Sequence, residues 1–275
     1  EEQPTGEISL LAGVGTTGTT VGGGIIEKNF LGKGINLETN LEVSEETIKG
    51  KFVYSKPNFA YTDNTLFTSI KATTSDFLAD SGYKVKETGF SLGTTYEQYE
   101  NLFFSPEISL AIEDLETDST ASIQRKKQEG TYEDFYFNYG LNYDLRDSSY
   151  RPTSGNNTSF YQQLPVISGN NEISNTFIHT KYKKLNQSSN MIGKASLYFK
   201  AVNSLDDSDV RISKRTQVPY NRLRGFEKGK IGPVDNTDYI GGNYVTALNF
   251  STNIPGILNT VENIDFLYFI DIANV

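Results

Sequence analysis

Apolar and polar residues alternate along many short stretches of this chain, which is the pattern of β-strands with one apolar face. The stretch DFYFNYGLNYD at 134–144 is the clearest case, with bulky residues on one face and small or polar residues on the other. Its bulky face consists of Phe135, Phe137, Tyr139, Leu141 and Tyr143. About ten residues suffice for a tilted strand to cross a bilayer, so stretches of this kind are long enough to span a membrane.

Similar alternation recurs from end to end, and no helical period is sustained. It is clear at 194–202 and 243–254, and in the final run, where Phe266, Tyr268, Ile270 and Ile272 oppose Leu267, Phe269, Asp271 and Ala273. Counting such runs on the template of a transmembrane barrel predicts about thirteen strands. Their expected starts are near Gly6, Val21, Ile35, Ile48, Thr65, Lys84, Leu102, Asp134, Thr158, Ile173, Met191, Gly242 and Asn263.

The connections between these runs alternate roughly between short turns, such as FLGKG and SEET, and longer polar loops, such as 114–130. A membrane barrel often has tight turns on one side and free loops on the other, so we expect the short and long connections to lie at opposite ends. The longest connection, about forty residues around NRLRGFEKGKIGP, is charged and dotted with glycine.

Composition leaves two classes of all-β protein open. The chain has 17 Tyr and 17 Phe in 275 residues, yet its mean hydropathy is -0.44. A soluble β-sandwich or adhesin fragment would bury the aromatic faces against a second sheet, whereas a membrane barrel would expose them to lipid. No window of 18 or more consecutive apolar residues occurs, which excludes a transmembrane helix.

Candidate chemistry is sparse. The chain has no Cys and one His, at position 179, so a thiolate site, a His-based metal centre and a Ser-His-Asp triad are disfavoured. We therefore expect no catalytic residues, no metal and no cofactor, and the protein is not expected to be an enzyme. A net charge of -9 argues against nucleic acid as a partner.

Several motifs, in this order, resemble the barrel domain of the BamA family of outer-membrane β-barrel assembly factors and their surface-antigen relatives. They are EEQPTGEISLLAGVG at the start, NFLGKG at 29–34, YSKPNFAYTD at 54–63, YDLRDSSYRPTSG at 143–155, LRGF at 223–226, GP at 232–233, YIGGN at 239–243 and FIDIANV at 269–275. The resemblance implies a transmembrane antiparallel β-barrel of the 16-stranded BamA type, here incomplete. No signal peptide is visible and the chain stops within an alternating run. We expect 1–275 to be one partial barrel domain, lacking the upstream POTRA domains and about three final strands.

In that family the loop between the eleventh and twelfth strands carries the RGF motif and folds back into the lumen. The resemblance implies this role for Leu223, Arg224, Gly225 and Phe226, flanked by Gly232, Pro233, Gly241 and Gly242. We expect Arg224 to pair with Asp271, Gly225 to allow a tight turn and Phe226 to anchor the loop by apolar burial. The family's second lumen acid would fall at Ser251, and Asp235 or Asp238 are candidates to replace it.

The resemblance further implies an insertase that templates strands at a weak lateral seam. The gate strand would consist of Gly6, Glu7, Ile8, Ser9, Leu10, Leu11, Ala12 and Gly13. Its partners would be nascent outer-membrane β-barrel proteins, accessory outer-membrane lipoproteins and the lipid bilayer, in the outer membrane of a Gram-negative bacterium. The alternative within the same superfamily is a two-partner secretion or translocation-and-assembly pore.

Overall fold

A computed structural model of the 275-residue chain describes residues 5–15, 18–167, 171–186, 191–206, 208–227, 229–236, 238–255 and 265–275. Thirteen strands form one antiparallel sheet in which every strand lies beside its neighbour in the chain. The first seven are β1 (Gly6–Gly15), β2 (Gly18–Glu27), β3 (Asn36–Ser44), β4 (Thr47–Lys56), β5 (Thr65–Phe77), β6 (Tyr83–Tyr99) and β7 (Leu102–Thr117). The other six are β8 (Gly130–Asp144), β9 (Gly155–Ile167), β10 (Glu172–Lys184), β11 (Ile192–Ser204), β14 (Tyr244–Pro255) and β15 (Asp265–Asn274).

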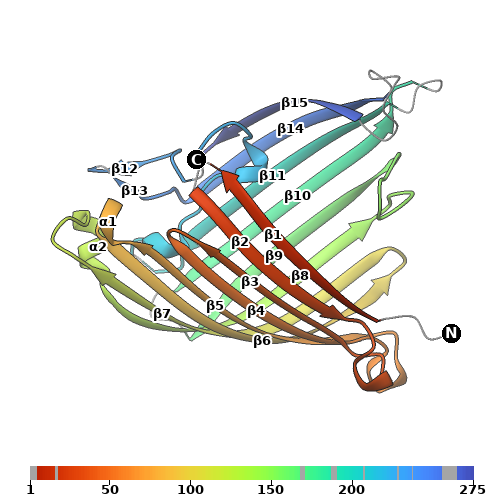
Figure 1. The fold of residues 1–275 in the computed structure, drawn as a ribbon, viewed down its shortest axis with the longest axis horizontal. Coiled ribbons are helices and arrows are strands. Elements are labelled where there is room, and N and C mark those ends of the chain that lie inside the picture. The colour runs from red at the N-terminus through yellow and green to blue at the C-terminus, as the bar shows by residue number, and fades with distance from the viewer. Residues whose placement is uncertain are drawn as a thin grey trace.

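The sheet curls around an interior, so that its first strands lie across from β8 to β11 (Figure 1). β1 and β15 are its two edges and do not pair with each other, so the sheet is not closed. The all-β fold, the thirteen strands and the incomplete barrel predicted from the sequence are thus confirmed. A second packed sheet, which the sandwich alternative requires, is not present among the described strands, where the other sheet is the two-stranded pair β12 (Val234–Asp235) and β13 (Asp238–Tyr239).

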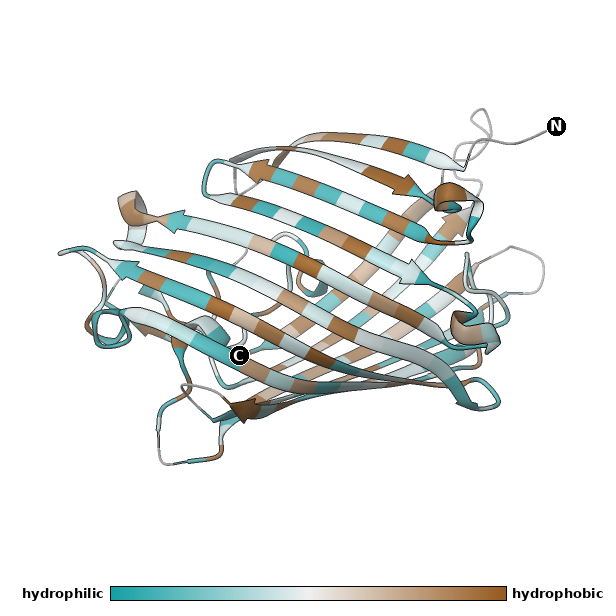
Figure 2. Ribbon diagram, turned by 90° about the horizontal axis from the view of Figure 1, so that it is seen from below, coloured by the Kyte–Doolittle hydropathy of each residue, from teal (hydrophilic) through white to brown (hydrophobic). Residues whose placement is uncertain are grey.

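The alternation read from the sequence divides the inner from the outer face. Figure 2 shows apolar and polar residues alternating along the strands. On β14, Val245 and Ala247 are fully buried while their neighbours Tyr244 and Phe250 are 53% and 47% exposed. Since the buried residues face the interior, the bulky exposed residues face outward, where a membrane barrel meets lipid.

The expected rhythm of short turns at one end and long loops at the other is wrong. Successive connections of an antiparallel sheet lie at alternate ends, so the turn of SEET, between β3 and β4, lies at the opposite end from FLGKG, between β2 and β3. The 145–154 connection lies at the same end as FLGKG, and the long 118–129 connection lies at the same end as SEET. The length of a connection therefore does not predict at which end of the sheet it lies.

Four short helical segments occur in the connections and termini of strands. They are η1 (Phe30–Gly32), η2 (Phe59–Tyr61), α1 (Leu78–Ser81) and α2 (Ile123–Lys127), and two more lie in the loop described next. None of the helices in the described residues is long and apolar enough to cross a membrane.

Candidate functional site

The segment 205–243, called the lumen loop below, connects β11 to β14, which are the eleventh and twelfth strands of the main sheet and pair directly. It contains η3 (Ile212–Lys214), η4 (Tyr220–Arg222), β12 and β13. A small apolar core holds its middle, where Val218 packs with Tyr198 of β11 and with the two buried residues of β14, Val245 and Ala247. The loop therefore lies against the inner face of the sheet, as the resemblance implied.

Arg224 contacts the inner wall through Asp271 of β15. The guanidinium Nε and Nη2 each donate to one carboxylate oxygen at 2.7 Å, and the backbone N–H of Arg224 donates to Oδ2 at 3.1 Å. The same guanidinium stacks over Phe269, 3.7 Å from the ring centroid. Its hydrogen bonds to Asp271 raise the pKa of Arg224. A two-pronged contact of this kind fixes orientation as well as position.

Asn249 of β14 is the second wall residue that takes part in this contact. The motif resemblance had placed the corresponding family residue, an acid, at Ser251 instead. Asn249 is the register partner of Asp271, whereas Ser251 pairs with Phe269. The Asn249 amide donates to Asp271 Oδ1 at 2.8 Å and to the carbonyl of Arg222 at 2.7 Å. An amide therefore links the wall acid to the loop backbone.

Arg222 adds a further contact to the same wall. Its Nη1 donates to Ser196 Oγ of β11 at 2.7 Å, and its guanidinium lies over the ring of Tyr198. Arg222 directly precedes LRGF and Arg224 is its second residue. Arg222 holds the loop to β11, and Arg224 holds it to β15.

The expected anchoring role of Phe226 is wrong, because its side chain is 60% exposed. Leu223 takes that role and packs against the apolar core of Val218. Gly225 has φ +87, a conformation that side chains rarely adopt, and nothing lies within 4 Å of where a Cβ would be. Backbone conformation, not close packing, is therefore what requires glycine there.

The flanking motif residues lie near the end of β15. Built Cβ atoms at Gly232 and Gly242 would lie 3.0 and 2.8 Å from Cγ1 of Val275. Gly242 also exchanges backbone hydrogen bonds with Thr216, at 2.8 and 2.9 Å. The carbonyl of Pro233 accepts from the N–H of Ile240, which closes the β12–β13 hairpin, and Gly241 has φ +68.

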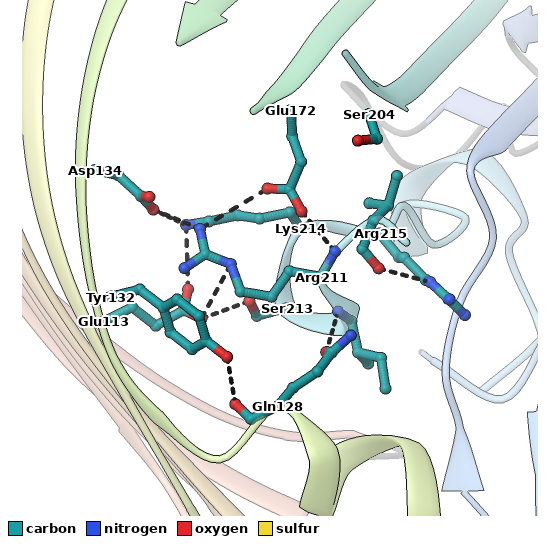
Figure 3. Close-up of polar contacts among 12 residues, drawn as sticks. Glu113, Gln128, Tyr132, Asp134, Glu172, Ser204, Arg211, Ser213, Lys214 and Arg215 are labelled. Atoms are coloured by element: carbon teal, nitrogen blue, oxygen red, sulfur yellow. Dashed lines mark hydrogen bonds and ion pairs between the residues drawn. The ribbon is translucent and has the colours of Figure 1, made fainter. Parts of the chain in front are cut away.

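The sequence analysis missed a second anchor, a buried charge cluster around Arg211 (Figure 3). Arg211 is 0% exposed, and its Nη2 donates to Asp134 Oδ2 of β8 at 2.5 Å. Its backbone N–H donates to Glu172 of β10 at 2.5 Å, and Glu113 of β7 lies 3.9 Å from its Nε. The guanidinium also lies over Tyr132, 4.2 Å from the ring centroid.

Lys214 completes this cluster. Its Nζ lies 3.1 Å from Glu113, 3.5 Å from Asp134 and 3.5 Å from Glu87 of β6. Burial by itself lowers the pKa of Lys214, but the negative charges of Glu113 and Glu87 outweigh that effect and the pKa is raised. Three loop residues, Arg211, Ser213 and Lys214, therefore contact acidic side chains on four strands, which are β6, β7, β8 and β10.

A third contact joins the lumen loop to α2, in the connection between β7 and β8. Arg125 is 4% exposed, pairs through Nε and Nη2 with Asp238, and lies 3.6 Å over the ring of Tyr83. Asp235 accepts from the N–H of Gln124 at 3.2 Å. The expectation that Asp235 or Asp238 supplies a second acid to Arg224 is wrong, because both bind this neighbouring loop.

The proposed gate strand, β1, pairs with β2 alone among the described strands. Lys28 donates to the carbonyl of Thr5 at 3.1 Å, and the register continues in single steps to Gly15. Alternate residues of an antiparallel pair exchange hydrogen bonds, so odd-numbered residues of β1 bond to β2. The backbone groups of the even-numbered residues point to the open edge; these are Gly6, Ile8, Leu10, Ala12 and Val14.

A search for clusters of acidic, His or Cys side chains that could hold a metal ion found none in the described residues.

The matches to known families and structures agree with this geometry. The model of the Omp85 superfamily domain matches residues 29–275. The chain belongs to the Omp85 superfamily. A search of curated proteins finds no match to this chain.

Two solved structures show how closely this member follows known barrels. The crystal structure of BamA from Haemophilus ducreyi lacking POTRA domains 1-3 is 22% identical, with a TM-score of 0.84, and the match covers 100% of this chain and 58% of that one. CdiB from Acinetobacter baumannii is 12% identical, with a TM-score of 0.52 and coverage of 98% and 48%. This Omp85 chain thus has the barrel fold of BamA and spans little more than half the length of that structure.

Proposed function

We propose that this chain is the barrel of an outer-membrane protein assembly factor, which inserts β-barrel proteins by templating their strands on β1. Superfamily membership and the BamA-like fold support an assembly role. The proposed location is the outer membrane of a Gram-negative bacterium. The proposed partners are unfolded barrel proteins and, as an expectation from the family, accessory lipoproteins.

The backbone groups that β1 directs away from β2 support the proposal, together with superfamily membership and the fold. Gly6, Ile8, Leu10, Ala12 and Val14 direct N–H and C=O groups away from β2. In hydrocarbon each unsatisfied backbone group costs several kcal/mol, so this side of β1 pairs either with another strand of the same barrel or with the strand of an incoming chain. An incoming chain would gain a row of hydrogen bonds there by β-augmentation. The step is pairing and release of backbone hydrogen bonds, without bond chemistry.

The test is Leu10→Pro in the full-length protein, with Leu10→Ala as the matched control. Both variants remove the leucine side chain. Proline also removes the backbone N–H of residue 10 at the edge, whereas alanine keeps it. Proline is tolerated on edge strands, so the barrel should still fold, as checked by heat-dependent gel migration. We expect insertion of an unfolded barrel protein into proteoliposomes to fall sharply with proline and to stay near the parent level with alanine.

A second experiment uses Leu10→Cys, because the chain has no Cys of its own. A disulfide to a cysteine in the substrate's last strand should form during insertion. A folded Leu10→Pro protein that inserts substrate at the parental rate overturns templating at β1. Passage of one secreted partner through the lumen, independent of β1, would instead favour the two-partner secretion or translocation-and-assembly alternative.

A further inference from the structure

A groove of about 370 Å³ lies on the sheet where β10, β11, β14 and β15 run side by side. Its floor is Gly193 and Ala195 of β11. Apolar side chains of Phe250, Tyr268 and Ile270 line one side. The proposed function makes no use of this groove.

The groove opens on the outer face of the barrel. On β11, Ser196 contacts the lumen loop through Arg222, so Gly193 and Ala195, at odd-numbered positions, point the other way. On β15, Asp271 faces the loop, so Tyr268 and Ile270 face outward. The residues that line this side are about half exposed: Phe250 is 47%, Ile270 49% and Tyr268 61% exposed. This surface would meet lipid.

Small residues create the groove. Gly193 has no side chain, and Leu185 folds over the position where its Cβ would be, 2.9 Å from Cδ2. The register places Gly193 opposite Thr252 and Ala195 opposite Phe250. A low floor between bulky neighbours makes an apolar slot of a width and chemistry suited to a hydrocarbon chain.

Two lysines form the other side of the groove. Lys181 pairs in register with Ala195, and Lys183 pairs with Gly193, so both side chains are on the outer face. Both are exposed, and within the described ranges no carboxylate lies at ion-pair distance from either. A lysine on the lipid-facing surface is costly near the bilayer centre. These two lie within the last residues of β10, so their ammonium groups can reach the headgroup region.

The groove lies at the end of the sheet where β1 begins, because even-numbered strands up to β10 end where β1 starts. In Figure 1 the start of β1 lies at the end of the sheet opposite to α1 and α2. In a sheet that spans a membrane, this end would lie in one leaflet, with the ammonium groups of Lys181 and Lys183 at its headgroup level.

We propose that the groove is a binding site for an anionic phospholipid, with one acyl chain over Gly193 and Ala195 and the phosphate between Lys181 and Lys183. Two positive charges with no ion-pair partner among the described residues favour a headgroup with net negative charge over a zwitterionic one. The inference rests on the proposed location of the sheet in a membrane, and it is independent of the templating mechanism.

The chain contains no Trp, so an introduced Trp reports on the lipid beside it. Tyr268→Trp lies in the groove wall, and Phe104→Trp is the matched reporter, outward near the same end of β7 and away from the groove. The full-length protein is reconstituted in vesicles containing brominated phosphatidylglycerol or, separately, brominated phosphatidylcholine at equal mole fraction. Quenching is measured after subtraction of the parent signal.

We expect brominated phosphatidylglycerol to quench Tyr268→Trp several-fold more strongly than brominated phosphatidylcholine does, and the two lipids to quench Phe104→Trp equally. Lys181→Gln with Lys183→Gln should lower the preference at Tyr268→Trp by about an order of magnitude. Lys184→Gln, one residue along on the opposite face, should leave it unchanged. Ala195→Phe, which fills the slot, should reduce quenching by both lipids.

Equal quenching of Tyr268→Trp by the two lipids overturns the site while leaving the membrane location intact. Loss of the preference in Lys184→Gln as well as in the double variant overturns it too, because general charge would then be the cause. Absence of quenching at Phe104→Trp by either lipid overturns the proposed membrane location, and with it the site. Insertion activity does not enter this comparison, so a failure of templating would be seen separately.

Discussion

The guanidinium of Arg211, from the lumen loop, lies 2.5 Å from the carboxylate of Asp134 on β8, and both side chains are 0% exposed. Burying such a pair costs desolvation that the attraction between the charges can only partly repay. An ion pair in this position therefore defines where the loop lies more than it adds net stability. Removal of one partner, by contrast, leaves a buried charge without compensation.

Arg211→Met should destabilise the folded barrel by about 3–5 kcal/mol, because the acids around it lose their main buried cation. The readout is the midpoint of thermal unfolding followed by heat-dependent gel migration. Lys230→Ala is the matched control: it removes a loop cation from an ion pair with Glu227 whose side chains are 56% and 50% exposed. That variant should shift stability by no more than a few tenths of a kcal/mol.

The double variant Arg211→Met with Asp134→Leu removes the charges of the pair together. It should recover part of the loss seen in Arg211→Met, because fewer buried charges remain unmatched. A double variant as unstable as the sum of its two single variants would show that the two residues do not act together, contrary to the geometry.

Arg224→Lys should loosen the tip of the lumen loop although the charge is kept. An ammonium group cannot reproduce the paired Nε and Nη2 contacts to the two oxygens of Asp271. A single cysteine at Phe226, which is 60% exposed, reports on this region by its rate of maleimide labelling. We expect Arg224→Lys to raise that rate several-fold and Arg224→Ala to raise it further.

Asn249→Ala tests the amide that links Asp271 to the loop backbone. It should raise the same labelling rate, since the two hydrogen bonds that the amide donates and the one that it accepts from Arg222 are lost. Ser251→Ala is its control on the same strand and same face. If Ser251→Ala had the larger effect, the position suggested by the family motif would be the right one and the observed register would be contradicted.

The contact between Arg125 and Asp238 should couple two loops that are separated by more than a hundred residues. Arg125→Lys should increase hydrogen exchange both in α2 and around β13, because the stacking on Tyr83 and the forked contact are lost together. Lys127→Gln, an exposed change in the same short helix, should leave both regions as in the parent. Increased exchange in α2 alone would show that the loops are independent.

The hydrogen bonds of Asp206 predict a pH range for the base of the lumen loop. Bonds from the Ser204 and Ser208 hydroxyls and from the N–H of Ser208 lower the pKa of Asp206 to about 2. Since the folded pKa lies below the unfolded value, the stabilisation is present above about pH 4 and is lost as the pH falls through about 2. A carboxyl carbon NMR titration should show a midpoint well below that of an unrestrained Asp.

Strand periodicity allowed most of the fold to be predicted, because one face of each strand is apolar and the period of two is fixed by backbone geometry. The strand that begins at Thr65 and the one that begins at Leu102 start where the pattern placed them. Loop contacts were harder to predict. The pairing of Arg224 with Asp271 came from motif resemblance, and alternation alone gave only that Asp271 faces inward.

The Arg211 cluster was missed because it joins residues from five separate segments. A signal was nevertheless present. Asp134 has the same parity as the polar face of its strand, and Glu113 and Glu172 are also inward acids, while RISKR at 211–215 brings several cations into one loop. Inward acids on neighbouring strands require a nearby cation, which the loop supplies. The exposed Phe226 shows the converse, that a motif residue need not be buried because it is apolar.

The glycines of β2 should set how firmly the edge strand β1 is held. A Cβ at Gly24 would lie 2.4 Å from Asn40 Oδ1 and 2.9 Å from Ser9 Oγ, so Gly24→Ala must displace a neighbour on β1 or β3. We expect this variant to weaken the β1–β2 pair and to increase hydrogen exchange of β1. Gly13→Ala is the matched control on β1 itself, because nothing lies within 4 Å of its Cβ position. That change should leave exchange unchanged or slow it slightly, since alanine reduces the freedom of the unfolded chain. Equal exchange of β1 in the two variants would show that close packing at Gly24 does not control the edge.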